Sequence, residues 1–185
     1  MQMIETARLH LRPATRKQLQ AELAGRDAFA EAMGMDIPAD WPPELFDADA
    51  ITYFLSLVKA AEHREAWSLF YIVLRADGGQ APALIGAGGF KGPPDGNGVV
   101  ELGYSILPAF RRRGFATEAV RGWTQFALSS PRVERVIAQT LSHLAPSIGV
   151  LEKAGFRFVG RGDDPDAPQG EEVMRYELSR ADPMS

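Results

Sequence analysis

The stretch ELGYSILPAFRRRGFATE, residues Glu101–Glu118, contains the transition that decides the fold. The apolar, β-rich residues of Val99–Leu107 predict a strand that closes at Pro108. From Ala116 onward apolar residues recur at a spacing of about 3.6, which predicts a helix that ends at Ser129-Ser130-Pro131. A strand therefore enters a helix across a turn of three consecutive arginines and a glycine.

That turn predicts a binding site for a pyrophosphate. The first four N–H groups of a helix lack partners within it, and the helix dipole adds about +0.5 charge at that end. Gly114 has no Cβ to keep a bulky ligand from the backbone, and Arg111, Arg112 and Arg113 add local positive charge. A solvated loop with a turn glycine is the alternative, but the strand–turn–helix context favours the anion site.

Length and composition exclude several other classes of protein. A chain of 185 residues, 45% hydrophobic and 24% charged, is typical of one globular domain, here expected over residues 1–185. The net charge of −4 argues against general binding to nucleic acid or a membrane surface, which needs a basic face. The sequence contains no cysteine, and its three histidines lie far apart, so we expect no metal site. Without a signal-peptide or membrane-span pattern, a cytoplasmic location is predicted.

Outward from the decisive stretch, the chain alternates strand and helix patterns without an internal repeat or a long linker. The pattern predicts an α+β domain, with an antiparallel meander followed by a β-α-β-α-β half. The other predicted strands are Ala7–Arg12, Ser68–Arg75, Ala81–Phe90, Val133–Thr140, Phe156–Gly160 and Glu172–Leu178, and the other predicted helices are Thr15–Ala32, Asp49–Arg64 and Pro146–Ala154.

Three motifs carry a family resemblance. Arg111-Arg112-Arg113-Gly114-Phe115-Ala116 resembles the (Q/R)xxGx(G/A) acyl-CoA motif of the GNAT superfamily of N-acyltransferases. The second motif of that family, T-x-x-x-N-x-x-S followed by vLeKxGF, is similar to Thr140–Ser147 together with Val150–Phe156. The opening Thr6–Arg12 resembles the TxRLxLR start of the branch that includes ribosomal-protein N-terminal acetyltransferases. The resemblance covers nearly the whole chain, and two of its motifs stand in the family's order and spacing.

The resemblance implies a GNAT-like fold, in which a central mixed sheet, mostly antiparallel, splays into a V and is flanked by about four helices. It implies that acetyl-CoA binds in the V, between the Val99–Leu107 and Val133–Thr140 strands. The pantetheine arm would pair with the strand backbone, and the pyrophosphate would lie on N–H groups from Arg112 to Thr117. The implied cofactor-binding residues are Ile106, Leu107, Arg111, Arg112, Arg113, Gly114, Phe115, Ala116, Thr117 and Ser147, with no metal.

Two positions depart from the family pattern. Leu144 stands where the second motif often has Asn, so we expect the loss of a polar contact to the pantetheine arm. The neighbouring His143 is a candidate replacement for that contact, and a solvated loop histidine is the alternative. Leu151 stands where many relatives carry a Tyr that acts as an acid for the departing thiolate. A thiol with a pKa of about 8.5 leaves readily as its anion, so that absence is tolerable.

The implied reaction is the direct attack of a primary amine on the thioester in a ternary complex. Glu101 is the candidate base, acting through water, on the strand face that also carries Gly103 and Ser105. The alternative for Glu101 is a strand-end glutamate paired with an arginine. A protein N-terminus or a small-molecule amine is the expected acceptor, with residues 34–64 and the Gly92–Gly98 turn lining its cleft. The alternative function is a non-catalytic acyl-CoA-binding or sensing module, and a homodimer is left open.

Overall fold

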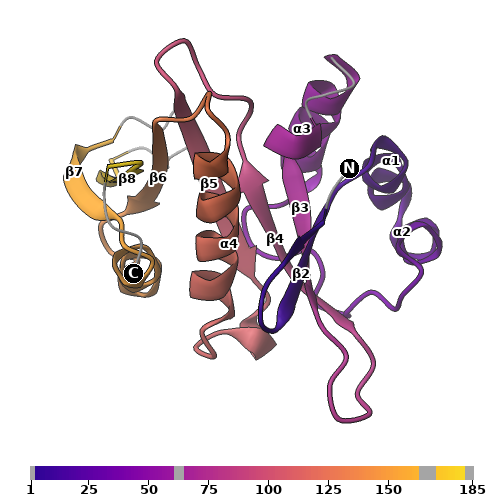
Figure 1. The fold of residues 1–185 in the computed structure, drawn as a ribbon. Coiled ribbons are helices and arrows are strands. Elements are labelled where there is room, and N and C mark those ends of the chain that lie inside the picture. The colour runs from indigo at the N-terminus through magenta and orange to yellow at the C-terminus, as the bar shows by residue number, and fades with distance from the viewer. Residues whose placement is uncertain (1–2, 61–64, 163–169, 182–185) are drawn as a thin grey trace.

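The computed structural model describes residues 3–60, 65–162 and 170–181. Within these ranges eight strands form one sheet in the order β1-β2-β3-β4-β5-β6-β8-β7 (Figure 1). Neighbouring strands pair antiparallel, except for β5 and β6, which are parallel. The strands are β1 (Ile4–Glu5), β2 (Leu9–Pro13), β3 (Leu69–Leu74), β4 (Ala83–Phe90), β5 (Val99–Ile106), β6 (Arg135–Leu141), β7 (Arg157–Arg161) and β8 (Val173–Ser179). The predicted α+β class, with a mostly antiparallel sheet, is confirmed.

Helices cover both faces of the sheet. Strand β3 shows the reason, because Phe70 and Ile72 face one core while Leu69, Tyr71 and Val73 face the other. The first core packs under α4 (Phe115–Ser129) and α5 (Ala145–Lys153), and the second packs under α1 (Arg16–Ala24), α2 (Arg26–Met33) and α3 (Ala48–Ala60). Figure 1 shows α4 lying across the front of the sheet.

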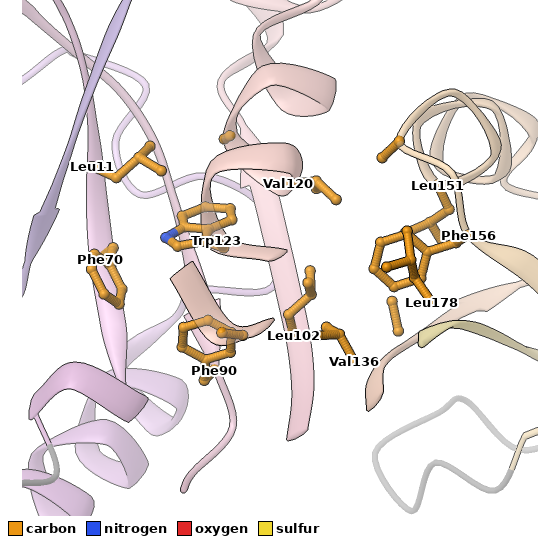
Figure 2. Close-up of a cluster of buried hydrophobic side chains, with 14 of the residues drawn as sticks. Leu11, Phe70, Phe90, Leu102, Val120, Trp123, Val136, Leu151, Phe156 and Leu178 are labelled. Atoms are coloured by element: carbon orange, nitrogen blue, oxygen red, sulfur yellow. The ribbon is translucent and has the colours of Figure 1, made fainter. Parts of the chain in front are cut away.

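Helix α4 is held against the sheet by its apolar stripe. Trp123 is fully buried, with its ring centroid 6.1 Å from that of Phe70 on β3, and Figure 2 shows it among the core side chains beneath α4. Gly88 of β4 makes this packing possible, because a Cβ there would lie 2.5 Å from the Trp123 ring. The stripe predicted from Ala116 onward is therefore the face that fixes α4. It also fixes the turn Arg111–Gly114 at the start of α4, which we call the arginine corner.

The single helix expected over Thr15–Ala32 is wrong. Thr15 caps α1 through a reciprocal pair of hydrogen bonds with Gln18, as a helix start requires. Gly25, however, adopts φ 125° and ψ 172°, a conformation outside the helical region that favours glycine, and α2 begins after it. The described residues thus hold five α-helices where the sequence predicted about four. The helix expected over Asp49–Arg64 corresponds to α3, which is described as far as Ala60. Residues 61–64 lie outside the described residues.

The loop between α2 and α3 is anchored by a partly buried carboxylate. Glu22 accepts hydrogen bonds from the Trp41 indole and from the Tyr71 hydroxyl, each at 2.7 Å. Burial raises the pKa of Glu22, and the hydrogen bonds from Tyr71 and Trp41 oppose that rise. This anchor fixes the loop that carries Glu44 to the edge of the site described below.

The expected V lies between β5 and β6. The two strands pair only from Val99↔Arg135 to Leu102↔Ala138. Beyond that point Gly103–Ile106 continue to pair with β4, while Gln139–Leu141 continue with β8. Each strand therefore follows its antiparallel neighbour, and the edges that face each other separate. Among the described helices, none has the length and apolar character needed to cross a membrane.

Candidate active site

The arginine corner leaves a row of backbone amides without partners. Strand β5 leads through a short 3-10 turn, Pro108–Phe110, to the exposed residues Arg111–Gly114 and then to α4. Within the described residues, the amides from Arg112 to Thr117 donate to no acceptor, and Glu118 is the first to bond back, to the Gly114 carbonyl at 3.1 Å. Six successive amides at an exposed helix start, next to a glycine with φ 82°, fit a diphosphate group.

The three arginines of the corner have different surroundings. Arg111 donates from Nε to the Ile106 carbonyl at 2.8 Å and from Nη2 to Glu44 at 2.8 Å, so its guanidinium supports β5 and the α2–α3 loop. Arg113 lies over the ring of Phe115, 5.0 Å from its centroid. Arg112 is exposed and adopts φ 61°, a left-handed conformation rare for a side chain of this size. Strained backbone of this kind is typical of ligand sites.

The N-terminal segment Thr6–Arg8 forms hydrogen bonds to the first turn of α4, and we call this contact the clasp. The Glu118 carboxylate accepts from the Thr6 hydroxyl at 2.6 Å and from the Arg8 amide and Nε at 2.7 Å each. Arg8 also donates to the Arg113 carbonyl at 3.1 Å and lies over the Phe115 ring. The sequence predicts Thr6–Arg12 as a family motif but predicts no role for Arg8. The signal for this contact in the sequence is the motif itself together with Glu118, an acidic residue in the first turn of the helix that follows the arginine corner.

This clasp predicts a pH dependence of stability. Burial acts to raise the pKa of Glu118, but the bonds from Thr6 and Arg8, with the charge of Arg8, outweigh it and lower that pKa. The stabilisation is therefore present above the unfolded-state pKa of about 4.3 and is lost as pH falls through the lower folded-state pKa. We expect Glu118→Gln to reduce the free energy of unfolding at pH 7 by about 1–2 kcal/mol, after discounting for the exposure of Arg8.

The measurement is urea unfolding of both proteins between pH 7 and pH 3. The difference in the free energy of unfolding between wild type and Glu118→Gln should decrease toward pH 3, where the Glu118 carboxyl becomes protonated in both the folded and the unfolded state. Glu31→Gln, on the exposed side of α2, is the matched control and should change the free energy by less than about 0.5 kcal/mol. A free-energy difference that stays constant with pH would contradict the claim that the charge of Glu118 stabilises the fold.

Glu101 lies at the apex of the V. It pairs in register with Ile137, one residue before the last paired position of β5 and β6. Its Oε1 lies 2.8 Å from Lys91 Nζ and 3.4 Å from Gln139 Nε2. The alternative prediction paired Glu101 with an arginine. The observed partner is instead a lysine, Lys91, from the turn after β4. The backbone of that lysine in turn accepts a hydrogen bond from the Tyr53 hydroxyl of α3.

The open part of the V carries backbone groups of β5. The Lys91 amide donates to the Glu101 carbonyl, and the Leu107 amide donates to the Ile85 carbonyl. Glu101 of β5 and Leu107, directly after β5, therefore direct backbone groups toward β4. By alternation, Tyr104 and Ile106 direct theirs toward the open edge. The Ile106 carbonyl already accepts from Arg111, which leaves its amide as the group for a ligand. Of the two predicted pairing positions, Ile106 is therefore better placed than Leu107.

Tyr104 and Ser147 meet across the open V. The Tyr104 hydroxyl lies 3.2 Å from both the Oγ and the carbonyl oxygen of Ser147, in the first turn of α5. Burial raises the pKa of Tyr104 to about 12, against the opposing effect of the Ser147 bond, so the phenol is protonated at neutral pH. Leu144 precedes α5 and gives it no side-chain cap. The V thus brings Ser147 to the same opening as Ile106.

Within the part of the chain that the structure describes, no three His, Asp or Glu side chains are grouped as a metal site would require. The polar groups gathered around the V are instead amides, the Glu101 carboxylate, the Tyr104 and Ser147 hydroxyls and cationic side chains, with Glu44 at its edge. This set suits an anionic ligand and proton transfer.

Comparison with known proteins agrees with this geometry. The family model described as "Acetyltransferase (GNAT) domain" matches residues 8–157. The uncharacterized N-acetyltransferase YjdG of Bacillus subtilis is 29% identical over 156 residues, which covers 84% of this chain and 90% of that protein. The uncharacterized N-acetyltransferase YoaA of the same organism is 26% identical over 162 residues, covering 85% of this chain and 84% of that protein.

Solved structures show the same fold at low sequence identity. An acetyltransferase of the GNAT family from Bacillus anthracis is 20% identical, with a TM-score of 0.64 over 98% of this chain and 100% of its own. RimL, a ribosomal alpha-N-protein acetyltransferase in complex with coenzyme A, is 15% identical, with a TM-score of 0.66 over 98% of this chain and 100% of its own. The family model spans well over half of the chain, and this protein therefore belongs to the GNAT acetyltransferase family.

Proposed function

We propose that this acyltransferase moves an acetyl group from acetyl-CoA to a primary amine by direct attack in a ternary complex. The observation that carries the proposal is the V between β5 and β6, which opens beside six unpartnered amides at the start of α4. A strand edge with free backbone groups suits the peptide-like pantetheine arm, and the amides suit the diphosphate. The two features stand in the order in which these parts follow one another in CoA.

The amides from Arg112 to Thr117 would hold the diphosphate, with Arg112 and Arg113 adding charge at the corner. Gly114, Phe115 and Ala116 contribute through the backbone, and the Thr117 hydroxyl is a further donor. Arg111 takes a different part, because its bonds to Ile106 and Glu44 position the edge of β5. Ile106 would offer its amide to the thioester oxygen as negative charge develops there.

Glu101 is the proposed base. As the amine nitrogen forms a bond to the acyl carbon, the carbon–sulfur bond breaks and the sulfur leaves as a thiolate. The proton that the nitrogen loses passes through a water molecule to the Glu101 carboxylate. Lys91 and Gln139 fix the orientation of that carboxylate.

The proposed acceptor is a protein N-terminus or a small-molecule amine. An α-amino group with a pKa of about 7.7–8.0 is roughly a tenth neutral at pH 7, whereas a lysine amine with a pKa of about 10.4 is almost wholly protonated. The first kind therefore needs less help from Glu101. A cytoplasmic location, a homodimer and a single domain over residues 1–185 stay predictions from the sequence.

The test is incubation with acetyl-CoA and a panel of amines, following free thiol and acetylated product together. The panel includes peptides with free N-termini, the same peptides N-terminally blocked, lysine-containing peptides and polyamines. We expect thiol release that depends on at least one amine class, with one acetylated amine for each thiol. Acetyl-CoA binding without amine-dependent release for any class would contradict the proposal and support the non-catalytic module.

A further inference from the structure

Lys91 brings a primary amine of the chain itself to the proposed base. It follows β4 directly and lies opposite Glu101, because its amide donates to the Glu101 carbonyl at 2.9 Å. Opposite residues of a sheet place their side chains on the same face, and the Lys91 Nζ accordingly lies 2.8 Å from the Glu101 Oε1. The Tyr53 hydroxyl donates to the Lys91 carbonyl at 2.7 Å, which fixes the backbone from which this side chain extends.

The space over β5 beside this ion pair is open. Gly103 is the first residue of β5 beyond its last pair with β6, and it lies on the same face as Glu101. A Cβ placed on Gly103 would meet no described atom within 4 Å, so the glycine leaves room at the start of the V. Two residues of a strand span about 7 Å, a distance that the flexible four-carbon stem of a lysine covers. The Lys91 amine can therefore enter this space without a shift of the backbone.

We propose that Lys91 is a self-acetylation site, whose Nζ takes the acetyl group from acetyl-CoA on the same protein molecule when no acceptor amine is bound. This inference rests on the proposed function, which requires an acceptor nitrogen close to Glu101 and to the acyl carbon. Lys91 already places a nitrogen beside Glu101, and its attachment to the chain gives that nitrogen a high effective concentration. The Lys91 side chain is 39% exposed, so an incoming acceptor can displace it.

The transfer to Lys91 balances with the groups that the site provides. A lysine amine is almost wholly protonated at pH 7, and the Glu101 carboxylate accepts the first proton directly from the Nζ. The neutral nitrogen then forms a bond to the acyl carbon as the carbon–sulfur bond breaks, and its second proton passes to the departing thiolate. The products are acetyl-lysine, CoA as its thiol and a protonated Glu101, which returns its proton to water. Acetylation removes the positive charge beside Glu101.

The experiment incubates the protein with acetyl-CoA and no amine, following free thiol together with peptide mass spectrometry. We expect thiol release to stop near one thiol per protein molecule, with the acetyl group on Lys91; an acetyl group found on Lys91 alone before incubation is the same result. Lys91 should react at least about tenfold faster than Lys17 on α1 and Lys153 on α5, two exposed lysines that report uncatalysed acetylation. The rate constant should not depend on protein concentration, because the transfer occurs within one molecule.

Two variants test the two members of the ion pair. Lys91→Arg keeps a positive charge beside Glu101, but its guanidinium stays protonated and is not acylated, so the release of thiol without amine should disappear. Glu101→Gln keeps the size of the side chain and should slow the acetylation of Lys91 at least about tenfold, because the nearby proton acceptor is lost. Lys153→Arg is the matched control and should leave the release unchanged. Circular dichroism shows whether each variant is folded.

The outcomes separate this inference from the function on which it rests. Amine-dependent thiol release by a protein whose Lys91 stays unmodified would overturn the self-acetylation and leave the acetyltransferase proposal intact. Equal acetylation of Lys91, Lys17 and Lys153 would also overturn it, as would a Lys91 rate that Glu101→Gln does not change, because the reaction would then be uncatalysed. Absence of thiol release both with and without amines would overturn the two proposals together.

Discussion

Replacing Gly114 with Asp is expected to weaken acetyl-CoA binding at least 100-fold in a protein that still folds. The substitution places a carboxylate beside the amides proposed to hold the diphosphate, so it replaces attraction by like-charge repulsion. Loss of even one charge-assisted contact costs about 1.5–3 kcal/mol, and here several amides are affected together. Calorimetric titration with acetyl-CoA measures the change, and circular dichroism with thermal unfolding shows whether the variant is folded.

Two controls separate charge from backbone strain. Gly114 has φ 82°, so any other residue is strained there, and a Cβ would lie 3.4 Å from Arg8 Nη2. Gly114→Ala should therefore lose stability but weaken acetyl-CoA binding by less than about tenfold, because it adds no charge. Gly34→Asp places the same side chain at another left-handed position, φ 65° at the end of α2, and should leave binding unchanged. An unaltered acetyl-CoA affinity in folded Gly114→Asp would show that the arginine corner does not bind the diphosphate.

Replacing Glu101 with Gln is expected to lower kcat by about 10²–10³-fold, the usual contribution of general base catalysis. Gln is nearly the same size and can still accept a hydrogen bond from Lys91, but it cannot take up the proton of the attacking amine. The dissociation constant of acetyl-CoA should change by less than about threefold. Val100 and Leu102 pack in the core under α4, so Glu101 between them lies on the opposite face of the sheet from α4, whose start carries the diphosphate corner. Steady-state kinetics with a saturating amine, beside calorimetry with acetyl-CoA, measure the two effects separately.

Glu177 offers a matched control for this experiment. It lies on β8 opposite Ile137, the residue that also pairs with Glu101, and its side chain is 20% exposed against 22% for Glu101. Glu177→Gln therefore removes a carboxylate from the same row of the sheet and should retain kcat. A second comparison uses Lys91→Met. If Glu101→Gln and Lys91→Met reduced kcat to the same small extent, the role of Glu101 would be to pair with Lys91, and the proposed base would be wrong.

Local sequence patterns predicted the parts of the site that depend on neighbours in the chain. The strand over Val99–Leu107, the corner and the helix after it were all recognisable, because each follows from residues within a few positions. The same reasoning failed over Thr15–Ala32, where helix-forming residues on both sides of Gly25 hid a break. Helices tolerate an interior glycine, so the sequence pattern alone does not show whether Gly25 interrupts the helix. The observed φ of 125° at Gly25 shows that it does.

The sequence by itself determined that a strand ends in an arginine corner and that a helix begins there with free amides. These features come from hydrogen bonds that a helix cannot make at its own start, wherever it lies in the fold. Only the tertiary structure decided which groups surround the corner. Thr6 and Glu118 meet across 112 positions, and Gln139 meets Glu101 across 38. Such contacts depend on how β5 and β6 separate and how α4 packs, and no local pattern contains that information.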